Sequence, residues 1–247
     1  MAGWIDLHCH LLPGVDDGAV DYAMSRDMAV QLMNAGFEVV TPSPHYGFGP
    51  GGHVVPAKTH QAVELLRADF SEHQLELELL PNSEHHLCPE MFGFFDRGDI
   101  VTIGGASSWV LIELPWHPIP NPEALIFRLA AKGYKLILAH PERYKYVDRT
   151  MVERLVSRGI LMQLEMGSFT GVYGRRAQER AWRYLERGWA HVLSTDLHRP
   201  NLTTFFDDAV SAIEQRFSRA TLDRGFSENP RKLLEDAVGD QIAPMVA

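Results

Sequence analysis

Seven short apolar runs recur along the chain, and each is separated from the next by a segment long enough for a helix. The runs are residues 4–7, 38–41, 75–80, 110–114, 136–139, 161–165 and 191–194. Most are bounded by turn residues and are largely apolar, as strands buried on both faces of a parallel sheet are. Strands that alternate with helices pair in parallel. We therefore expect an α/β fold whose seven parallel strands are closed, or nearly closed, into a barrel.

The segments between the runs carry helical patterns. Counted with their caps, the expected helices are residues 22–35, 56–68, 121–131, 148–157, 175–186, 201–217 and 229–237. Asn121, Asp148, Asn201 and Asn229 are predicted N-caps or helix-opening residues, because their side chains accept hydrogen bonds from the free N–H groups of a first turn. An open doubly wound sheet is the alternative. Its usual G-x-G-x-x-G segment does not follow the first run.

The composition is that of a globular protein and excludes several classes. The 247 residues include 23 Lys and Arg against 32 Asp and Glu, which gives a formal charge of −9. This balance argues against a nucleic-acid partner, because phosphate backbones require a basic face. No apolar run approaches the roughly 20 residues of a membrane helix, and no secretory signal is visible. We expect a cytoplasmic protein without membrane insertion, and an oligomer is compatible with the sequence.

Functional residues of such barrels sit where the strands end. At six of the seven expected strand ends, the chain carries His or a carboxylate, and the residues are His8, His10, Asp16, Asp17, His45, Glu84, Glu113, His140, Asp196 and His198. These residue types bind Zn, Mn and Fe. A spacing of two directs His8 and His10 to the same face of a strand. We predict a metal cluster, because the alternative of ordinary surface histidines needs six coincidences on one rim.

Charge counting indicates what the cluster binds. Two divalent ions would balance the four negative charges of the acids expected to bind metal, and three would leave +2, ready for an anion; these acids are Asp17, Glu84, Glu113 and Asp196. Arg143 follows His140 by three residues and adds a planar fork suited to phosphate oxygens. An ion pair of Arg143 with Glu142 or a surface acid is the alternative. The sequence thus favours a metal centre that binds a phosphate.

Taken together, these residues resemble the PHP (polymerase and histidinol phosphatase) superfamily, and most closely its CpsB/CapC-type tyrosine phosphatases of bacterial capsule and exopolysaccharide operons. The resemblance rests on IDLHCHLLPGVDDGA, TPSPHY, LIELP, GYKLILAHPERY, QLEMGSFTGVYG and STDLH, which run from about residue 4 to 199. VDDGA and HPERY are its specific parts. It implies a distorted (β/α)7 barrel in a single domain over 1–247, with a catalytic core of about 4–199 and C-terminal helices at about 201–240.

The resemblance also implies a site and a substrate. Three divalent ions are expected, commonly manganese, with iron, zinc and magnesium as alternatives. Carried over by position, one ion is held by His8, His10, Glu84 and Asp196, a second by Glu84, Glu113 and His140, and a third by Asp17, His45 and His198. Arg143 matches the arginine that contacts the phosphate. The expected activity is hydrolysis of phosphotyrosine in the tail of a bacterial tyrosine kinase that controls capsule or exopolysaccharide synthesis.

One departure and one cysteine bear on this expectation. Asn82 stands where relatives usually have Gly, which leaves the local backbone open and makes His85 or His86 a substitute ligand to consider. Cys9 is not expected to be a nucleophile, because the Cys-x5-Arg arrangement of thiol phosphatases is missing. Five aromatic residues of rim-side segments could stack on a tyrosine ring, although each alone also fits packing, namely Tyr46, Phe48, Trp116, Phe169 and Tyr173.

Three other functions stay open at this point. A PHP phosphatase acting on a small metabolite such as histidinol phosphate would use the same metals. An amidohydrolase-type enzyme would also begin with His-x-His, but it typically carries a carboxylated Lys on the fourth strand, where this chain has Glu113. The third is a noncatalytic, metal-stabilised module that regulates polysaccharide assembly.

Overall fold

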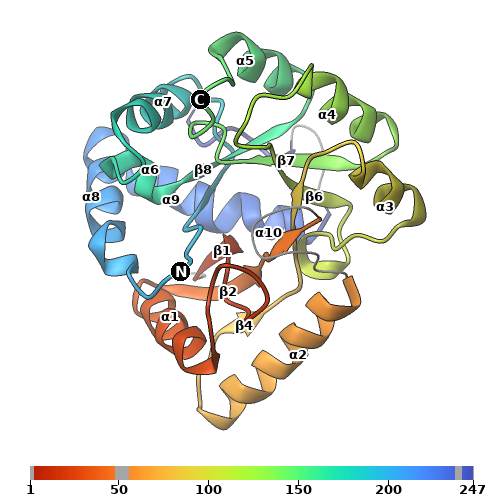
Figure 1. Cartoon of the computed structure of the whole chain (residues 1–247). Coiled ribbons are helices and arrows are strands. Elements are labelled where there is room, and N and C mark those ends of the chain that lie inside the picture. Colours follow the sequence, from red (N-terminus) through yellow and green to blue (C-terminus); the bar gives the residue numbers. More distant parts are fainter. Residues whose placement is uncertain (1–2, 48–55, 237–240, 247) are drawn as a thin grey trace.

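The computed structural model describes residues 3–47, 56–236 and 241–246, and within them the strands form two parallel sheets surrounded by helices (Figure 1). One sheet has the order β1-β2-β4, with strands Trp4–Cys9, Phe37–Pro42 and Glu78–Leu79. The other has the order β3-β5-β6-β7-β8-β9, with strands His45–Tyr46, Glu84–His86, Trp109–Glu113, Lys135–Ala139, Leu161–Glu165 and Val192–Ser194. Every pairing between neighbours is parallel.

The nine strands follow seven successive paths of the chain. β2 leads into β3 through Ser43 and Pro44, and β4 leads into β5 through residues 80–83. Backbone hydrogen bonds span both interruptions, because Ser43 N donates to Cys9 O at 2.8 Å and Glu84 N donates to Pro44 O at 3.1 Å. The seven predicted strands therefore correspond to these seven paths, two of which are broken where the chain passes from one sheet to the other.

The first path lies beside the last one. Asp196 N donates to His8 O and His10 N donates to Leu197 O, each at 2.9 Å. Cys9 and Leu197 form an isolated parallel bridge. The prediction of an α/β fold with parallel strands is confirmed, and the fold has the sequential strand order of a (β/α)7 arrangement. Among the described residues, however, the hydrogen-bonded ladder is divided into two sheets and is not a continuous closed barrel.

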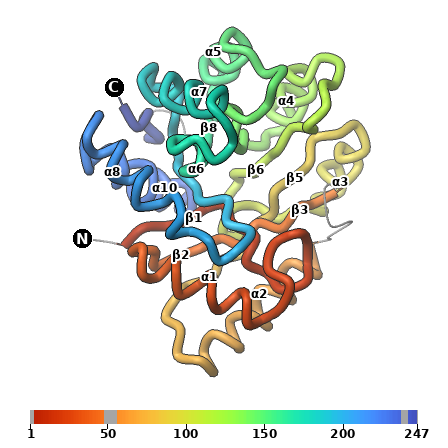
Figure 2. Tube along the Cα trace, turned by 60° about the vertical axis from the view of Figure 1, so that its left-hand side comes forward, coloured from red at the N-terminus to blue at the C-terminus, as the bar shows by residue number. Residues whose placement is uncertain are grey.

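Ten α-helices cover the described strands. They are α1 Tyr22–Asn34, α2 Pro56–Glu72, α3 Met91–Arg97, α4 Pro122–Ala131, α5 Arg149–Ser157, α6 Met166–Thr170, α7 Arg175–Glu186, α8 Phe206–Arg216, α9 Arg219–Asp223 and α10 Asn229–Leu234. Both views place α1 and α2 at one end of the molecule and α4, α5 and α7 at the other (Figures 1 and 2). In the described part of the chain, no helix combines the length and the apolar character needed to span a bilayer.

Two of the predicted caps are confirmed. The Asn121 side chain accepts from Ala124 N at the start of α4, and the Asp148 side chain accepts from Met151 N at the start of α5. The prediction for Asn201 is wrong, because this residue precedes a 3-10 turn, Leu202–Thr204, and its side chain makes no capping bond.

The prediction that Asn229 and Pro230 open the last helix is confirmed, because α10 begins at Asn229, although the Asn229 side chain does not cap it. A π-helical turn, Arg224–Glu228, runs directly into α10, and the buried Asn229 amide donates to His191 O and Ala243 O at 2.7 Å. The side chain satisfies two carbonyls of distant segments and is therefore not used as a cap. The end of this helix was expected at about residue 237, which lies outside the described residues.

The predicted strand over 75–80 is only partly correct. α2 continues to Glu72, and Leu75 N donates to Phe70 O at 2.9 Å, so the first residues of the run serve to end the helix. Gln74 adopts a positive φ of 56°, which is incompatible with a strand. Pairing with β2 is left to Glu78 and Leu79.

The C-terminal helices share the core of the strands. Trp4 of β1 stacks on Phe226 with ring centroids 5.2 Å apart and meets Phe206 of α8 edge-on at 5.9 Å. All three side chains are buried. Aromatic contacts of this kind add to the stabilisation that burial of their area already supplies. The last part of the chain thus packs against the strand that carries His8 and keeps that strand in place.

Candidate metal centre

The structure brings all nine predicted ligands together at the carboxyl ends of the strands. His8, His10 and Asp17 come from β1 and the loop after it, and His45, Glu84 and Glu113 belong to β3, β5 and β6. His140 follows β7, and Asp196 and His198 follow β9. Seven of the nine are buried; Asp17 is exposed and His198 is half-buried.

Glu84 lies in the middle of this cluster. Its Oε2 atom is 3.4 Å from His8 Nε2 and 3.0 Å from His45 Nδ1, and its Oε1 atom is 3.0 Å from His140 Nε2. A carboxylate that reaches histidines on three different strands can bridge neighbouring ions. The geometry therefore suits the shared role that the resemblance implies for Glu84.

Two further carboxylates gather the remaining rings. Asp196 Oδ1 is 3.2 Å from both His8 Nε2 and His10 Nε2. Asp17 Oδ1 is 3.4 Å from His45 Nε2 and 3.5 Å from His198 Nε2. The rings are thus divided between a buried side, at Asp196, and a solvent side, at Asp17.

Ligand atoms within 4.8 Å of one another form four overlapping groups. These are His10, Asp17, His45 and His198; His8, Glu84 and His140; His8, His10 and Asp196; and His45, Glu84 and Glu113. Because His8, His10, His45 and Glu84 each occur in two groups, the arrangement matches several adjacent ions sharing ligands better than one isolated ion.

Unpaired polar atoms provide a test of whether cations fit. His45 Nδ1, Glu84 Oε2, Asp196 Oδ1 and His140 Nδ1 are buried and make no hydrogen bond, although charged partners lie close to the first three. Buried polar atoms are normally hydrogen-bonded, because leaving them unpaired costs free energy. His and carboxylate atoms that converge without bonding to one another are suited to a cation between them.

The pKa values of residues in the cluster also indicate a site suited to cations. Burial disfavours the charged form of His10, but Asp16 and Asp196 outweigh it and raise the pKa of His10 to about 10. Burial would raise the pKa of Glu84, but His8 and His45 hold it well below its usual range. The carboxylates therefore stay ionised and require nearby positive charge. Protons on the histidines supply that charge when no ion is present, and divalent ions would compete with these protons.

Two of the candidate ligands have a backbone conformation that is unusual for their residue type. His140 has a φ of 34° and Asp196 has a φ of 48°, in the left-handed region that non-glycine residues seldom occupy. Each residue directly follows a strand or its extension. This conformation turns the chain at the strand end, so that the side chain reaches the cluster, and such strain is characteristic of functional positions.

Two residues outside the nine predicted ligands support them. Asp16 Oδ2 is 2.7 Å from His10 Nδ1, and Gln163 Oε1 is 2.9 Å from His8 Nδ1. Bonds to the far nitrogen of a ring fix its orientation and its tautomer. The polar Gln163 in an otherwise apolar run was a signal in the sequence, whereas the role of Asp16 depended on how its loop folds.

Arg143 lies at the edge of the cluster and forms two ion pairs. Its Nη1 atom donates to Glu165 Oε2 at 2.9 Å and to Asp196 Oδ2 at 2.6 Å. The alternative pairing with Glu142 is wrong, because that buried carboxylate accepts from Glu165 N and Ser168 Oγ instead. Glu165 is a further residue that the sequence did not reveal. Both ion pairs use one nitrogen, so Nε and Nη2 of Arg143 have no hydrogen-bond partner among the residues described.

The local questions raised by the sequence have structural answers. Asn82 donates from Nδ2 to Leu7 O at 3.0 Å and to Thr41 Oγ1 at 3.3 Å, so it ties β1 and β2 to the turn before β5. His85 points away from the cluster into apolar surroundings, where burial lowers its pKa to about 4. His86 does reach the cluster, with Nδ1 3.2 Å from Glu113 Oε1.

Burial raises the pKa of the Cys9 thiol well above its usual range, which makes it a poor nucleophile.

The rim aromatics separate into two groups. Tyr46 and Phe169 are buried and serve packing. Trp116 and Tyr173 are 45% and 38% exposed and lie against Arg143. Phe48 and most of the Gly-rich segment 47–52 lie outside the described residues.

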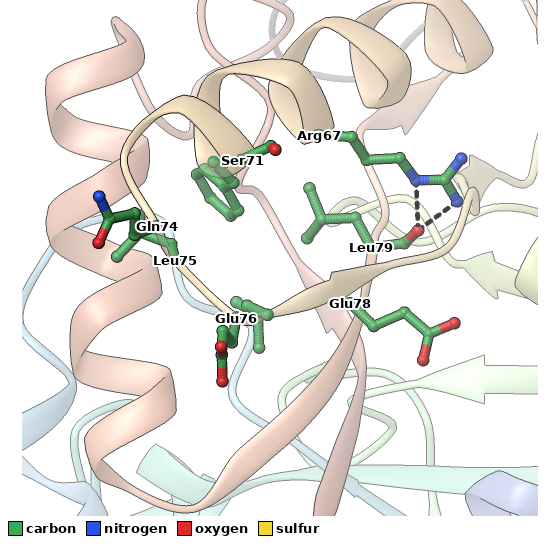
Figure 3. A pocket seen from close by; sticks show the side chains of 9 residues that line it. Arg67, Ser71, Gln74, Leu75, Glu76, Glu78 and Leu79 are labelled. Atoms are coloured by element: carbon green, nitrogen blue, oxygen red, sulfur yellow. Dashed lines mark hydrogen bonds between the residues drawn. The ribbon is translucent and has the colours of Figure 1, made fainter.

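A groove of about 560 Å³ between α2 and β4 offers no comparable chemistry (Figure 3). Arg67 donates from Nε to Leu79 O at 2.9 Å and approaches the same oxygen with Nη2. None of its lining residues belongs to the groups of potential metal ligands found in the described part of the chain. Within the described ranges, the groups of potential metal ligands therefore lie at the strand ends.

Known proteins place this geometry in a family. The model of the family described as capsular polysaccharide synthesis, CpsB/CapC, matches residues 4–235. The chain belongs to this family. Tyrosine-protein phosphatase YwqE of Bacillus subtilis is 29% identical over 237 residues, which cover 94% of this chain and 89% of the relative. A chain from the crystal structures described as YwqE from Bacillus subtilis and CpsB from Streptococcus pneumoniae, unique metal-dependent tyrosine phosphatases, superimposes with a TM-score of 0.84 at 27% identity, over 97% of this chain and 98% of that one.

A more distant likeness concerns the fold alone. Histidinol phosphate phosphatase from Lactococcus lactis, solved with zinc, histidinol and phosphate, has a TM-score of 0.54 at 11% identity over 88% of this chain and 93% of that one. The parallel α/β arrangement is thus shared with this phosphatase.

Proposed function

We propose that this protein is a metal-dependent phosphatase that hydrolyses phosphotyrosine in a bacterial tyrosine kinase and so controls capsule or exopolysaccharide synthesis in the cytoplasm. The observation that carries the proposal is the free edge of Arg143 beside a cluster of nine metal-binding side chains. The family membership and the tyrosine phosphatases among the relatives support the same activity.

The nine side chains would hold three divalent ions, with manganese the first choice. His8, His10, Glu84 and Asp196 would hold one ion, Glu84, Glu113 and His140 a second, and Asp17, His45 and His198 a third. When bound, these ions would supply a Lewis acid for the phosphate and lower the pKa of a coordinated water.

Arg143 would orient the phosphate. Glu165 and Asp196 fix Nη1, so the free Nε and Nη2 present two parallel N–H groups to phosphate oxygens. As negative charge builds on those oxygens in the transition state, a guanidinium already held in place stabilises it without reorganisation. Water attacks phosphorus in line with the ester oxygen, the P–O bond to the tyrosine breaks, and inorganic phosphate and a free tyrosine result.

The leaving group suits this site. A tyrosyl oxygen has a pKa of about 10, so it departs with less protonation than the alkoxide of a serine would need. A strong general acid is therefore not required for this reaction. The preference for phosphotyrosine over phosphoserine follows in part from this difference.

The proposal is tested by metal analysis combined with a substrate panel. The purified protein is assayed on phosphotyrosine peptides, phosphoserine peptides and histidinol phosphate, with manganese and with excess chelator. We expect hydrolysis of phosphotyrosine that requires the metal. Preference for histidinol phosphate would move the function to a metabolic phosphatase, and activity unchanged by the chelator would exclude the mechanism.

Arg143 gives the matched test of the site. Arg143→Lys keeps the charge but loses the planar fork, and we expect kcat/KM for phosphotyrosine to fall about 100-fold while the bound metal stays unchanged. Arg149→Lys, at the first position of α5 and outside the cluster, is the control. Equal activity of the two variants would remove Arg143 from the mechanism.

A further inference from the structure

Exposed aromatic surface stands directly next to the buried charged centre. Trp116 follows β6, and Tyr173 belongs to the segment between α6 and α7, so two separate parts of the chain deliver the rings. They are 45% and 38% exposed, and Val172 beside Tyr173 is 55% exposed. Large apolar side chains that remain in water next to a polar site are typical of ligand recognition.

Both rings contact residues of the candidate site. The Cζ atom of Arg143 lies 4.0 Å from the centroid of the Tyr173 ring and 4.8 Å from that of Trp116. Trp116 is also stacked on His140, with centroids 5.7 Å apart and an angle of 11° between the planes. The positions of the rings are thus fixed relative to the group that would bind the phosphate and to a candidate metal ligand.

A hollow of about 100 Å³ adjoins Tyr173. Its lining includes Val172 and Tyr173 together with Asp196 and His198 of the candidate metal centre. It therefore offers both apolar and charged surface. A ligand that is ionic at one end and aromatic at the other suits this combination, because each end finds its own kind of surface.

We propose that Trp116 and Tyr173 contact the aryl group of the substrate and determine the preference of the site for aromatic over alkyl phosphate esters. The proposal rests on the proposed function, since it places the phosphate on the free edge of Arg143. A phosphate held there directs its ester group out of the buried cluster, past the two rings that flank the guanidinium. A phenyl ring gains favourable contact with them, whereas a short alkyl group does not.

The competing interpretation is that the rings only hold Arg143 in position through cation–π contacts. In that case, removal of a ring would weaken the binding of every phosphate equally. Direct contact with the aryl group predicts a selective loss instead. The two interpretations therefore differ in the ratio of two affinities.

Two phosphonates measure this ratio without interference from leaving-group chemistry. Benzylphosphonate carries an aromatic ring and methylphosphonate does not, and neither is hydrolysed. Calorimetric titration into manganese-loaded protein gives both dissociation constants for the wild type, Trp116→Ala, Tyr173→Ala and the ring-retaining Trp116→Phe and Tyr173→Phe. Leu65→Ala on α2, whose side chain is 51% exposed, is the control for loss of exposed apolar surface.

We expect each alanine variant to bind benzylphosphonate about tenfold more weakly and methylphosphonate within about twofold of the wild type. The phenylalanine variants and Leu65→Ala should retain both affinities. The alanine variants should also lower kcat/KM for phosphotyrosine more than for phosphoserine. Trp116→Leu and Tyr173→Leu, which keep apolar volume without a ring, replace an alanine variant that does not fold.

Equal weakening of both phosphonates, or no change in either, would overturn the inference while leaving a wild type active on phosphotyrosine as support for the proposed function. A wild type that binds neither phosphonate and hydrolyses no phosphate ester would overturn both. The two failures are therefore distinguishable in the same set of measurements.

Discussion

Two buried histidines at opposite ends of the parallel strands, His10 and His191, differ in charge. At the carboxyl ends, carboxylates raise the pKa of His10 to about 10 despite its burial. At the amino end of β9, burial lowers the pKa of His191 to about 4, and Trp109 and Leu161 line the same hollow. The same residue type is thus a cation in one place and a neutral polar group in the other. Burial alone removes charge from a histidine, and only carboxylates at ion-pair distance restore it.

The largest loss of function is expected when the central carboxylate of the cluster at the carboxyl ends is removed. Glu84→Gln keeps the shape of the side chain but removes the charge that His8, His45 and His140 share. We expect at least about a 1,000-fold loss of phosphatase activity and loss of bound metal, because a carboxylate shared by neighbouring ions supports more than one of them. Activity assays and elemental analysis measure the two effects.

Glu78→Gln is the matched control for this variant. Glu78 is an exposed carboxylate of β4 in the groove of Figure 3, outside the metal-binding groups. It should retain activity and metal. If Glu84→Gln also retained its metal, the central role of this carboxylate would be wrong.

The next largest effect is expected from removal of the metal, which should lower the stability of the folded protein. Ions that bind only the folded state stabilise it by about 2.7 kcal/mol per site at 100 times their dissociation constant. Chelation should therefore lower the melting temperature of the wild type by roughly 5 °C or more. Differential scanning calorimetry checks this, and a chelator-induced shift of the same size in Glu84→Gln would contradict it.

A smaller effect is expected from the residue that fixes Arg143. Glu165→Gln replaces the buried carboxyl group that accepts from Arg143 Nη1 but leaves the nine candidate ligands intact. We expect inorganic phosphate to inhibit the variant about tenfold more weakly, with unchanged metal content, because the guanidinium is held less rigidly. A purely structural role for Glu165 would lower thermal stability and leave the inhibition constant unchanged.

The lowered pKa of His191, at the amino end of β9, is tested by the pH dependence of stability. His191 has a folded-state pKa of about 4, below its ordinary value near 6.5, so its contribution is fully present above pH 6.5 and is lost as the pH falls toward 4. Between pH 7.5 and 5, we expect the wild type to lose about 2 kcal/mol more unfolding free energy than His191→Asn. Asn retains an acceptor for Met162 N, which donates to His191 Nδ1 at 3.3 Å.

Urea unfolding at the two pH values measures this difference. The two proteins share all other titrating groups, so their difference isolates His191. Parallel pH profiles would show that His191 has the same pKa in the folded and unfolded states and that the contrast between the two ends is wrong.

The smallest effect is expected in the groove between α2 and β4. Arg67→Ala removes the bonds to Leu79 O that Figure 3 shows, at a half-exposed site, and we expect a loss of stability of about 1 kcal/mol or less with unchanged activity. Chemical denaturation and the phosphotyrosine assay check both. A loss of activity would mean that a change in the groove affects the metal-binding cluster at the strand ends.

Features encoded by neighbouring residues could be predicted from the sequence, whereas features that depend on contacts between distant residues could not. Alternation of apolar runs and helical patterns predicted the strand paths, because strand and helix periods are written in neighbouring residues. The caps Asn121 and Asp148 were recognisable for the same reason. The start of the last helix at Asn229 was also predicted, but the partners of its amide were not, since they are two carbonyls that lie far away in the chain.

The candidate site shows the same division. His or carboxylate residues at six of the seven expected strand ends, among them the pair His8 and His10 and Glu113 in an apolar strand, predicted a metal cluster at one rim. The carboxylates that orient the site, Asp16 and Glu165, could not be identified in this way, because each acts on a side chain from another part of the fold or loop.

The sequence by itself therefore determined the fold class and the chemistry of the strand ends, since both depend on residue type and on short, regular spacing. Only the tertiary structure decided that the ladder is divided into two sheets, that Arg143 keeps one edge free, and that Trp116 and Tyr173 stand beside it. These features arise from contacts between distant segments, whose energies depend on packing and distance and leave no periodic trace in the chain.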